Sequence, residues 1–257
     1  MAQRRTVIIT RPRAQAQSLA DAIRGLGAQA VIAPAIRVAA PSSWRRLDAA
    51  LRRLDAYDVV VFTSANGVDR FFVRARRVLG GPPRLPRRLF AIGPATAAAL
   101  RRRGWRGASV PDRYEGEALA RHLLRQVGGV RGKRVLLPRA RVARDVLPRL
   151  LARAGARVDV VESYRTVADR AGRRRLARAA AEGGSPIVTF TSPSTVHEFV
   201  AAVGLRKARR FFRSAAAASI GPITSQALRG YGIAPAAQAQ PYTVAGLARA
   251  VARLLPL

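Results

Sequence analysis

The sequence has no cysteine, two histidines and only 14 acidic residues among 257, and each shortage removes a class of chemistry. Without cysteine there are no disulfides, thiolate nucleophiles, iron–sulfur clusters or cysteine-based zinc sites. His122 and His197 lie in predicted helices and lack the spacing of metal ligands. The carboxylates are scattered rather than paired for acid–base catalysis, and no nucleophile elbow, P-loop or dinucleotide fingerprint occurs. We therefore predict neither a metal ion nor a cofactor.

Long hydrophobic runs are also absent, since no apolar stretch approaches the ~18–20 residues of a membrane-spanning helix. The first residues, Met1–Thr6, include two arginines and lead directly into the strand-like Val7-Ile8-Ile9, which is unlike a secretory signal. Hydrophobic residues nevertheless make up 49% of the chain, enough for the cores of two domains. These features predict a cytoplasmic globular protein that does not enter a membrane.

Positive charge is in large excess, with 47 lysines and arginines and a formal net charge of +33. Only Lys133 and Lys207 are lysines. One explanation is a compositional bias that spreads arginines over solvated helix faces, and the other is an anionic partner, either nucleic acid or a polyanionic metabolite. Clusters such as Arg101–Arg103 and Arg173–Arg175 contain no aromatic residues, which disfavours a stacking platform for single-stranded nucleic acid. No recognition helix or zinc finger occurs, so we expect no nucleic-acid partner.

The chain resembles itself when it is shifted by 128 residues, without a gap over most of its length. This period is too long for a solenoid, whose repeats span ~20–50 residues, and it predicts two similar domains. The matches gather where a strand ends and a helix begins. They include Val7-Ile8-Ile9 with Val135-Leu136-Leu137, Arg11 with Arg139, Phe62-Thr63-Ser64 with Phe190-Thr191-Ser192, and Ile92-Gly93-Pro94 with Ile220-Gly221-Pro222. A cleft between two such domains is a common place for a ligand.

Short apolar strands alternate with amphipathic helices in both halves, which predicts an α/β fold with parallel sheets. Strands such as Val59–Phe62 are apolar at every position, as in a sheet covered by helices on both faces. About five strands in each half fit a flavodoxin-like sheet. The predicted strands include Ala30–Val38 and Ala108–Val110.

The domain boundary has two alternatives. The repeat places it near Gly128-Gly129. However, Ile36–Pro41 and its repeat partner Tyr164–Ala168 are long extended segments that compete for the same role by crossing between domains. The residue pattern alone leaves both open.

Six turns after predicted strands carry residues suited to binding anions. In a parallel sheet such turns meet at the carboxyl edge, where ligands bind, and the free N–H groups of helix N-termini favour anions. The turns are Thr10-Arg11-Pro12, Thr63-Ser64-Ala65-Asn66, Gly93-Pro94-Ala95-Thr96, Pro138-Arg139-Ala140-Arg141, Thr191-Ser192-Pro193-Ser194 and Gly221-Pro222-Ile223-Thr224. The alternative is that the hydroxyl residues only cap their helices, which applies to Ser64, Thr96, Ser192 and Thr224. Together the turns predict a ligand with several negative charges.

These turns and several other segments resemble the uroporphyrinogen-III synthase family over essentially the whole chain. Each segment alone is a weak signal, whereas their order, spacing and coverage are specific. They are Val7–Pro12, Phe62–Val68, Ile92–Thr96 followed by Gly104, Tyr114–Leu119, Gly132–Arg139, Val161–Thr166, Phe190–Ser194 and Ile220–Thr224. The resemblance implies two flavodoxin-like α/β domains joined by a two-stranded β-ladder. One domain would comprise residues 1–36 and 168–257 and the other 41–162, with 37–40 and 163–167 as crossing linkers.

The resemblance also implies a carbon–oxygen lyase that uses no cofactor. Such an enzyme cyclises hydroxymethylbilane, a linear tetrapyrrole with eight carboxylates, to uroporphyrinogen III. Water is lost and the last pyrrole ring is inverted, in a step of haem, chlorophyll and cobalamin biosynthesis. A pyrrole nitrogen of the substrate expels the hydroxyl group, so the protein mainly folds and positions the chain. A cytoplasmic monomer is implied, with hydroxymethylbilane synthase as a transient partner.

The expected site residues follow from the resemblance, position by position. Tyr164 stands at the family's recurrent tyrosine and would donate a proton to the leaving hydroxyl; the alternative is a tyrosine that only packs at the domain joint. Arg11, Arg139 and Arg141 are candidate partners of substrate carboxylates, and a solvated role is the alternative for each. The other expected binding residues are Thr63, Ser64, Gly93, Pro94, Thr96, Ser192, Gly221, Pro222 and Thr224.

Two other functions stay open on the sequence alone. A binder of an anionic metabolite, or a family member without activity, would use the same turns, and Tyr164→Phe would then change affinity no more than a neighbouring substitution. A nucleic-acid-binding protein driven by the +33 charge would lose affinity steeply with added salt and would not respond to changes in the turns.

Overall fold

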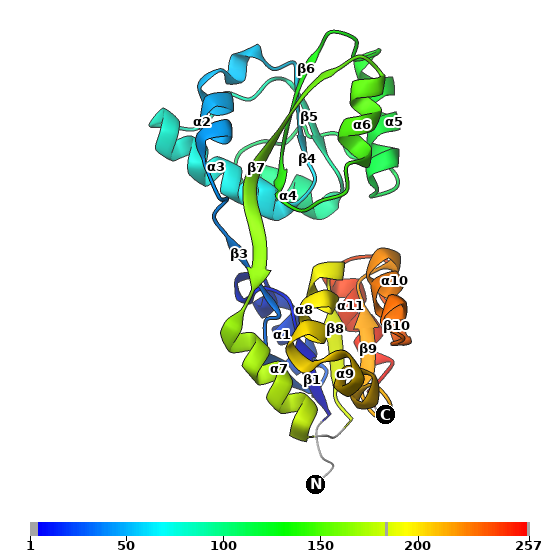
Figure 1. Cartoon of the computed structure of the whole chain (residues 1–257). Coiled ribbons are helices and arrows are strands. Elements are labelled where there is room, and N and C mark those ends of the chain that lie inside the picture. Colours follow the sequence, from blue (N-terminus) through cyan, green and yellow to red (C-terminus); the bar gives the residue numbers. More distant parts are fainter. Residues whose placement is uncertain (1–4, 183–184, 256–257) are drawn as a thin grey trace. The chain divides into compact units, whose positions relative to one another are not determined.

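The chain folds into two compact units (Figure 1). The computed structural model describes residues 5–182 and 185–255. One unit combines the chain up to Arg37 with the chain from Val167, and we call it the discontinuous unit. The other comprises Val38–Thr166 and is called the continuous unit. Each unit is built on one five-stranded sheet.

In the discontinuous unit, five parallel strands lie in the order β10-β9-β8-β1-β2. The strands are β1 (Thr6–Ile9), β2 (Gln29–Ile32), β8 (Ile187–Phe190), β9 (Ala216–Ser219) and β10 (Pro235–Gln238). One face is covered by α7 (Arg170–Glu182), α8 (Pro193–Val203), α9 (Leu205–Phe211) and α10 (Pro222–Gly230), and the other by α1 (Arg13–Gly25) and α11 (Val244–Ala252). Because both faces are covered, consecutive strand residues pack into opposite layers: Ile8 into the first and Ile9 into the second.

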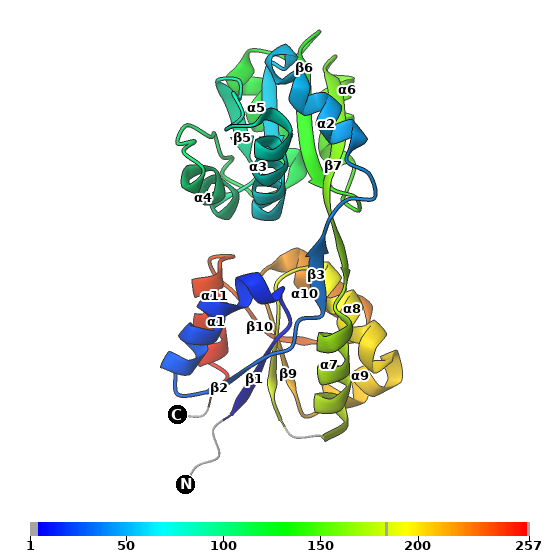
Figure 2. The same ribbon diagram turned by 90° about the vertical axis from the view of Figure 1, so that its left-hand side faces the viewer.

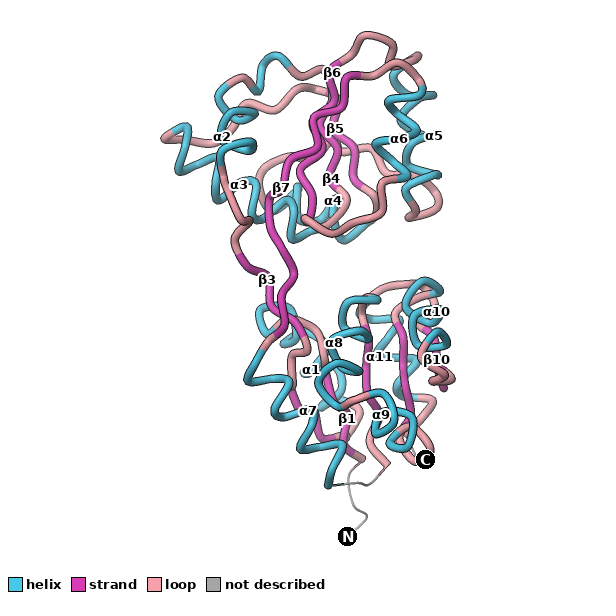
Figure 3. Tube along the Cα trace, viewed as in Figure 1, coloured by secondary structure: helices cyan, strands magenta, loops and turns pink. Residues whose placement is uncertain are grey.

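In the continuous unit, the sheet order is β3-β7-β6-β4-β5. The strands are β3 (Ile36–Ala39), β4 (Val59–Phe62), β5 (Arg88–Ala91), β6 (Arg134–Ala140) and β7 (Arg157–Ala168). One face is covered by α2 (Arg45–Arg52), the 3-10 turn η1 (Leu54–Ala56), α3 (Ala65–Leu79) and α4 (Pro94–Arg102), and the other by α5 (Gly116–Val127) and α6 (Val146–Arg153). Figure 3 shows the strands of each sheet between their helices.

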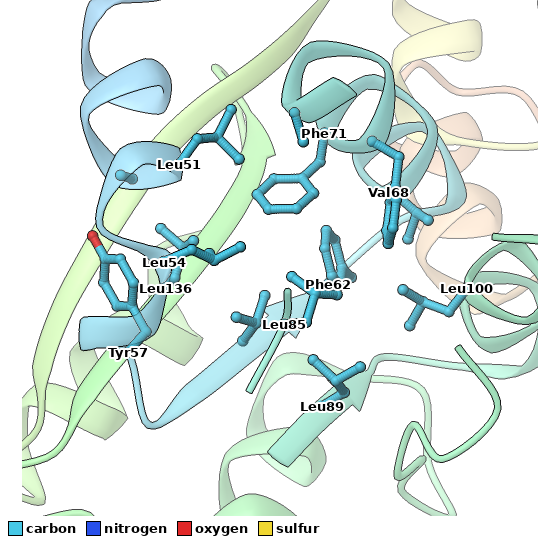
Figure 4. Close-up of a cluster of buried hydrophobic side chains, with 14 of the residues drawn as sticks. Leu51, Leu54, Tyr57, Phe62, Val68, Phe71, Leu85, Leu89, Leu100 and Leu136 are labelled. Carbon is cyan, nitrogen blue, oxygen red and sulfur yellow. The ribbon is translucent and has the colours of Figure 1, made fainter. Parts of the chain in front are cut away.

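The internal repeat extends into the packing of both cores. In the continuous unit, the buried rings of Phe62 and Phe71 meet edge-on, with centroids 5.3 Å apart, among leucines from the surrounding helices and strands (Figure 4). The equivalent residues of the discontinuous unit, Phe190 and Phe199, meet edge-on at 5.5 Å. Such a pair is worth roughly 0.5–1.5 kcal/mol beyond the area it buries. The repeated sequence therefore specifies a repeated core.

Both sheets have a flavodoxin-like strand order. In chain order the discontinuous unit reads 2-1-3-4-5, as β2-β1-β8-β9-β10. The continuous unit has the equivalent strands in the same places, β7-β6-β4-β5 plus a fifth segment, but β6 and β7 follow β4 and β5 in the chain, so its connectivity is circularly permuted. That fifth segment is a single bridge between Phe90 and Ser109, so the predicted strand Ala108–Val110 is wrong as a strand. The predicted fold class is confirmed.

One further local prediction is wrong, and one helix is not predicted. The expected strand Ala30–Val38 is interrupted after Ile32, because Pro34 lacks the N–H that a strand interior needs, and β3 begins only at Ile36 in the other sheet. Helix α9 is not predicted by the sequence pattern. It has seven residues, too few for a clear helical period, and only Ala208 and Phe211 of them are buried.

The chain passes between the units within β3 and within β7, and these two strands are neighbours in the sheet. β3 has four residues and β7 has 12, so β3 can pair with only part of β7. Figure 2 shows β3 beside the later part of β7. The earlier part of β7 is therefore an edge of the sheet on that side.

We expect Gly172→Ala to destabilise the discontinuous unit by about 3 kcal/mol, at the upper end of overpacking costs. A Cβ at Gly172 of α7 would stand 1.8 Å from the carbonyl oxygen of Pro34. Both sides of this clash are backbone, so no side chain can rotate away to remove it. Gly25→Ala is the matched control, because no atom lies within 4 Å of a Cβ at that end of α1 and alanine favours helix by up to ~1 kcal/mol. Urea midpoints compare the two variants. Equal midpoints would contradict the close approach of α7 to Pro34.

Candidate functional site

Each sheet has a switch point at its carboxyl edge, where neighbouring strands lead into helices on opposite faces. β4 and β6 are neighbours, yet α3 after β4 and α6 after β6 cover different faces. β1 and β8, followed by α1 and α8, are the equivalent pair in the discontinuous unit. Ligands of open α/β sheets bind in the crevice at such a point. The predicted turns that contain Arg11, Ser64 and Ser192 follow three of these strands. The predicted turn Pro138-Arg139-Ala140-Arg141 is wrong over most of its length, because β6 continues to Ala140 and Arg139 therefore lies in the strand.

A buried tyrosine of β7 lies against the start of α3. Tyr164 is 7% exposed, and its hydroxyl lies 2.9 Å from Ser64 Oγ. Ser64 is the N-cap of α3, and its Oγ accepts a hydrogen bond from the backbone N–H of Gly67 at 3.0 Å. A Cβ at Gly67 would stand 3.8 Å from Tyr164 Cε1. The turn after β4 thus holds the phenol in place, and Ser64 caps its helix as one alternative expected.

Two side chains, Ser64 and Asn66, form hydrogen bonds with the Tyr164 hydroxyl. Burial raises the pKa of Tyr164, while hydrogen bonds with Ser64 and Asn66 oppose the rise. Because Ser64 Oγ already accepts from Gly67, its own proton can be donated to the phenol oxygen. Either hydroxyl can be the donor in this hydrogen bond, and when Ser64 donates, Tyr164 can give its proton to a further acceptor. Asn66 is a site residue that sequence reasoning missed, although its place in the turn after β4 was a signal.

A pocket of about 160 Å³ adjoins the same switch point. Its lining includes Thr63, Arg139 and residues at the starts of α5 and α6. Arg139 donates to the carbonyl oxygen of Arg144 at 3.0 Å and pairs with Asp145, the N-cap of α6. The guanidinium lowers the pKa of Asp145. Arg139 therefore has a carboxylate partner within its own unit.

The equivalent arginine of the discontinuous unit has no such partner. Arg11 follows β1, but the residue equivalent to Asp145 in the first repeat is Gln17. Arg11 Nη2 lies 3.4 Å from Gln15 Oε1, whereas its Nε and Nη1 are buried without a hydrogen-bond partner among the described residues. Desolvation by burial lowers the pKa of Arg11. A guanidinium in this state favours an anionic ligand that supplies the missing acceptors.

The Gly-Pro turns start α4 and α10 in the same way. Gly93 is the N-cap of α4, Pro94 occupies the first helical position, and Thr96 is 3% exposed in the first turn. The equivalent residues of α10 are Gly221, Pro222 and Thr224. An exposed tyrosine covers each N-cap: a Cβ at Gly93 would stand 3.2 Å from Tyr114 Cγ, and one at Gly221 3.4 Å from Tyr242 Cγ. A Cβ at Gly93 would require the Tyr114 ring to shift by a few tenths of an ångström, whereas one at Gly221 would make an ordinary van der Waals contact.

Other predicted residues are engaged locally. Ser192 caps α8, where its Oγ accepts from the backbone N–H of Thr195 at 3.3 Å. Arg141 donates to Ser42 Oγ at 3.0 Å. Within residues 5–182 and 185–255, no group of three or more acidic or histidine side chains could hold a metal ion. No helix in that part of the chain has the length and hydropathy to cross a membrane.

The fold and these turns define a class of protein: two flavodoxin-like α/β units, each with helix N-termini and an arginine at its switch point. The sequence model of the family described as uroporphyrinogen-III synthase HemD matches residues 17–249. The chain belongs to this family and is a cyclising lyase of tetrapyrrole biosynthesis. The predicted family and activity are confirmed.

The chain is similar to uroporphyrinogen-III synthases over nearly its full length. A putative uroporphyrinogen-III synthase of Methanothermobacter thermautotrophicus is 34% identical over 248 residues, covering 95% of this chain and 96% of the relative. The uroporphyrinogen-III synthase of Synechococcus elongatus is 28% identical and covers 96% and 94%. A mutant uroporphyrinogen III synthase of Thermus thermophilus shares the fold, with a TM-score of 0.67, 21% identity and coverage of 96% and 97%. The Helicobacter pylori enzyme has a TM-score of 0.62, 15% identity and coverage of 98% and 100%.

Proposed function

We propose that this chain cyclises hydroxymethylbilane to uroporphyrinogen III with Tyr164 as the proton donor. The observation that carries this role is the buried phenol, whose hydroxyl lies 2.9 Å from Ser64 Oγ; when Ser64 donates in this hydrogen bond, Tyr164 can give its own proton to the substrate. A pyrrole nitrogen of the substrate expels the terminal hydroxyl, the C–O bond breaks, and the Tyr164 proton goes to the departing oxygen as water leaves. The terminal ring attacks the resulting azafulvene to form a spiro intermediate, which fragments and recloses. The proton lost on reclosure can return to Tyr164.

The remaining turns bind the substrate's carboxylates in this proposal. Arg11 supports such a role best, because two of its buried nitrogens lack acceptors. Ser64, Thr96, Ser192 and Thr224 belong to helix N-termini, whose free N–H groups suit carboxylates. Arg139 and Thr63 contribute through the pocket that they line. Positioning by such contacts can supply ~7–11 kcal/mol toward the barrier.

The proposal is tested by generating hydroxymethylbilane in situ and separating the product isomers by chromatography. We expect type III uroporphyrinogen to predominate, because the enzyme must invert the last ring faster than the free substrate closes. If folded protein gave only the spontaneous type I isomer, the chain would lack the activity. A non-catalytic binder of anionic metabolites would then be the better description.

A cytoplasmic monomer that receives its substrate from hydroxymethylbilane synthase completes the proposal, on the strength of the resemblance. Gel filtration tests the monomer. Transfer of the substrate between the two enzymes without release is tested by adding a large excess of an inactive variant as a trap. Unchanged type III yield would support direct transfer.

A further inference from the structure

A groove of about 750 Å³ lies beside the early part of β7, within the continuous unit. Its lining consists of Ser43, residues of α2 and the chain after it, Tyr57, and Val158–Val161 of β7. This volume is in the range of ligand sites, roughly 300–1,000 Å³. None of Ser64, Arg139 or Tyr164 lines it, so it is separate from the proposed active site.

The β7 side of this groove is an open sheet edge. No residue of β3 lines the groove, and β3 is too short to pair with all of β7. The backbone N–H of Arg157 donates to the carbonyl oxygen of Lys133 next to β6, at 2.9 Å. Because backbone groups alternate in direction along a strand, Val158 and Val160 direct their N–H and C=O groups away from β6 and toward the groove. An open edge of this kind is a template for a further strand.

The groove is also strongly basic. Arg45 and Arg46 of α2 and Arg53 after it are exposed and line it, and none of them forms an ion pair with another described residue. The one acidic lining residue is Asp159, which already has partners. Its Oδ2 accepts from the Tyr57 hydroxyl at 2.6 Å and lies 3.6 Å from Arg134 Nη2. The groove therefore offers three unpaired guanidinium groups to a ligand.

We propose that an extended acidic segment of a partner protein binds in this groove as an added strand on β7. Its main chain pairs with the outward groups of Val158 and Val160, and acidic side chains on every second residue face the arginines of α2. A second copy of this chain is a poor occupant, because it would bring the same arginines and a net charge of +33 to the edge. A small anion alone would leave the outward N–H and C=O groups of Val158 and Val160 without hydrogen-bond partners.

The probe is a fluorescent eight-residue peptide of alternating glutamate and valine, added to the full-length chain. The control peptide has the same sequence with N-methyl groups on alternate residues, which remove one edge of backbone donors and keep the charge. We expect the control to bind at least about tenfold more weakly. We also expect the parent peptide to shift the amide resonances of Val158 and Val160. Equal binding of both peptides would overturn strand addition.

Two pairs of substitutions distinguish binding in this groove from non-specific attraction to the positive charge of the whole chain. We expect Arg46→Glu with Arg53→Glu to weaken peptide binding at least about tenfold and to leave synthase activity unchanged. Arg121→Glu with Arg125→Glu makes the same charge change at exposed positions of α5, on the other face of the sheet, and should alter binding less than about twofold. Equal losses in both pairs would show non-specific attraction. Saturable shifts of the Val158 and Val160 amides by inorganic phosphate alone would show a small-anion site. Either result overturns the proposal.

Discussion

Replacing Tyr164 by phenylalanine should lower kcat for type III uroporphyrinogen by at least about 100-fold, the lower end of what a positioned general acid contributes. The ring stays and only the hydroxyl is lost, so folding and KM should change little. Since burial raises the pKa of this phenol above its ordinary value of 10, its acid form is present throughout neutral and mildly alkaline pH. The wild-type kcat should therefore show no loss from Tyr164 ionisation up to about pH 9.5. The in situ assay with isomer separation measures both quantities.

Tyr57→Phe is the matched control for this prediction. Tyr57 is also a buried tyrosine of the continuous unit, but its hydroxyl donates to Asp159 and it does not adjoin the turn after β4. We expect near-normal kcat for Tyr57→Phe and an intermediate loss for Ser64→Ala, which keeps the phenol and removes its partner. Similar kcat values for the two tyrosine variants would exclude Tyr164 as the proton donor.

The second large effect is expected at Arg11, whose replacement should weaken substrate use without lowering stability. Arg11→Met should lower kcat/KM roughly 10- to 100-fold, because charge-assisted hydrogen bonds are worth about 1.5–3 kcal/mol. The same substitution should leave the urea midpoint unchanged or raise it, because a buried guanidinium with two unpartnered nitrogens does not stabilise the free protein. Kinetics of the coupled reaction and urea unfolding provide the two measurements.

Two other arginines serve as controls for Arg11. Arg13→Met changes an exposed residue at the start of the same helix and should alter neither quantity. Arg139→Met should lower stability, because it removes the ion pair with Asp145 and the hydrogen bond to the carbonyl oxygen of Arg144. If Arg11→Met instead lowered the midpoint and left kcat/KM intact, Arg11 would be a structural residue rather than a binding one.

The repeat explains why so much of the fold can be predicted from the sequence. Apolar strands such as Val59–Phe62 and their copies at offset 128 indicate both sheets, and the turns between elements indicate the carboxyl edges. The places where the prediction is wrong lack such a pattern. Pro34 divides one apolar stretch between two sheets, and the segment around Ser109 reaches β5 through a single bridge. Which strand pairs with which is decided by the whole sheet and not by the local residues.

The candidate site is less predictable than the fold, because whether a side chain is free to bind a ligand depends on its hydrogen-bond and ion-pair partners elsewhere in the chain. Arg11 and Arg139 occupy equivalent positions, and the sequence analysis treats them alike. Their difference arises six residues later, where Asp145 in one repeat corresponds to Gln17 in the other. The contact between Tyr164 and Ser64 joins residues 100 positions apart, which no local pattern reveals.

The division of the chain into units has a consequence for synthesis on the ribosome. The continuous unit is one uninterrupted stretch, so its strands emerge within a single span of chain, apart from the first residues of β3 and the last of β7. In the discontinuous unit, β1 must wait for β8: the hydroxyl of Thr10 donates to the carbonyl of Thr189, 179 residues later. Until then β1, α1 and β2 have an open central edge and no closed core. During synthesis from the N-terminus, the first strand to be made is therefore among the last to pair with its final neighbours.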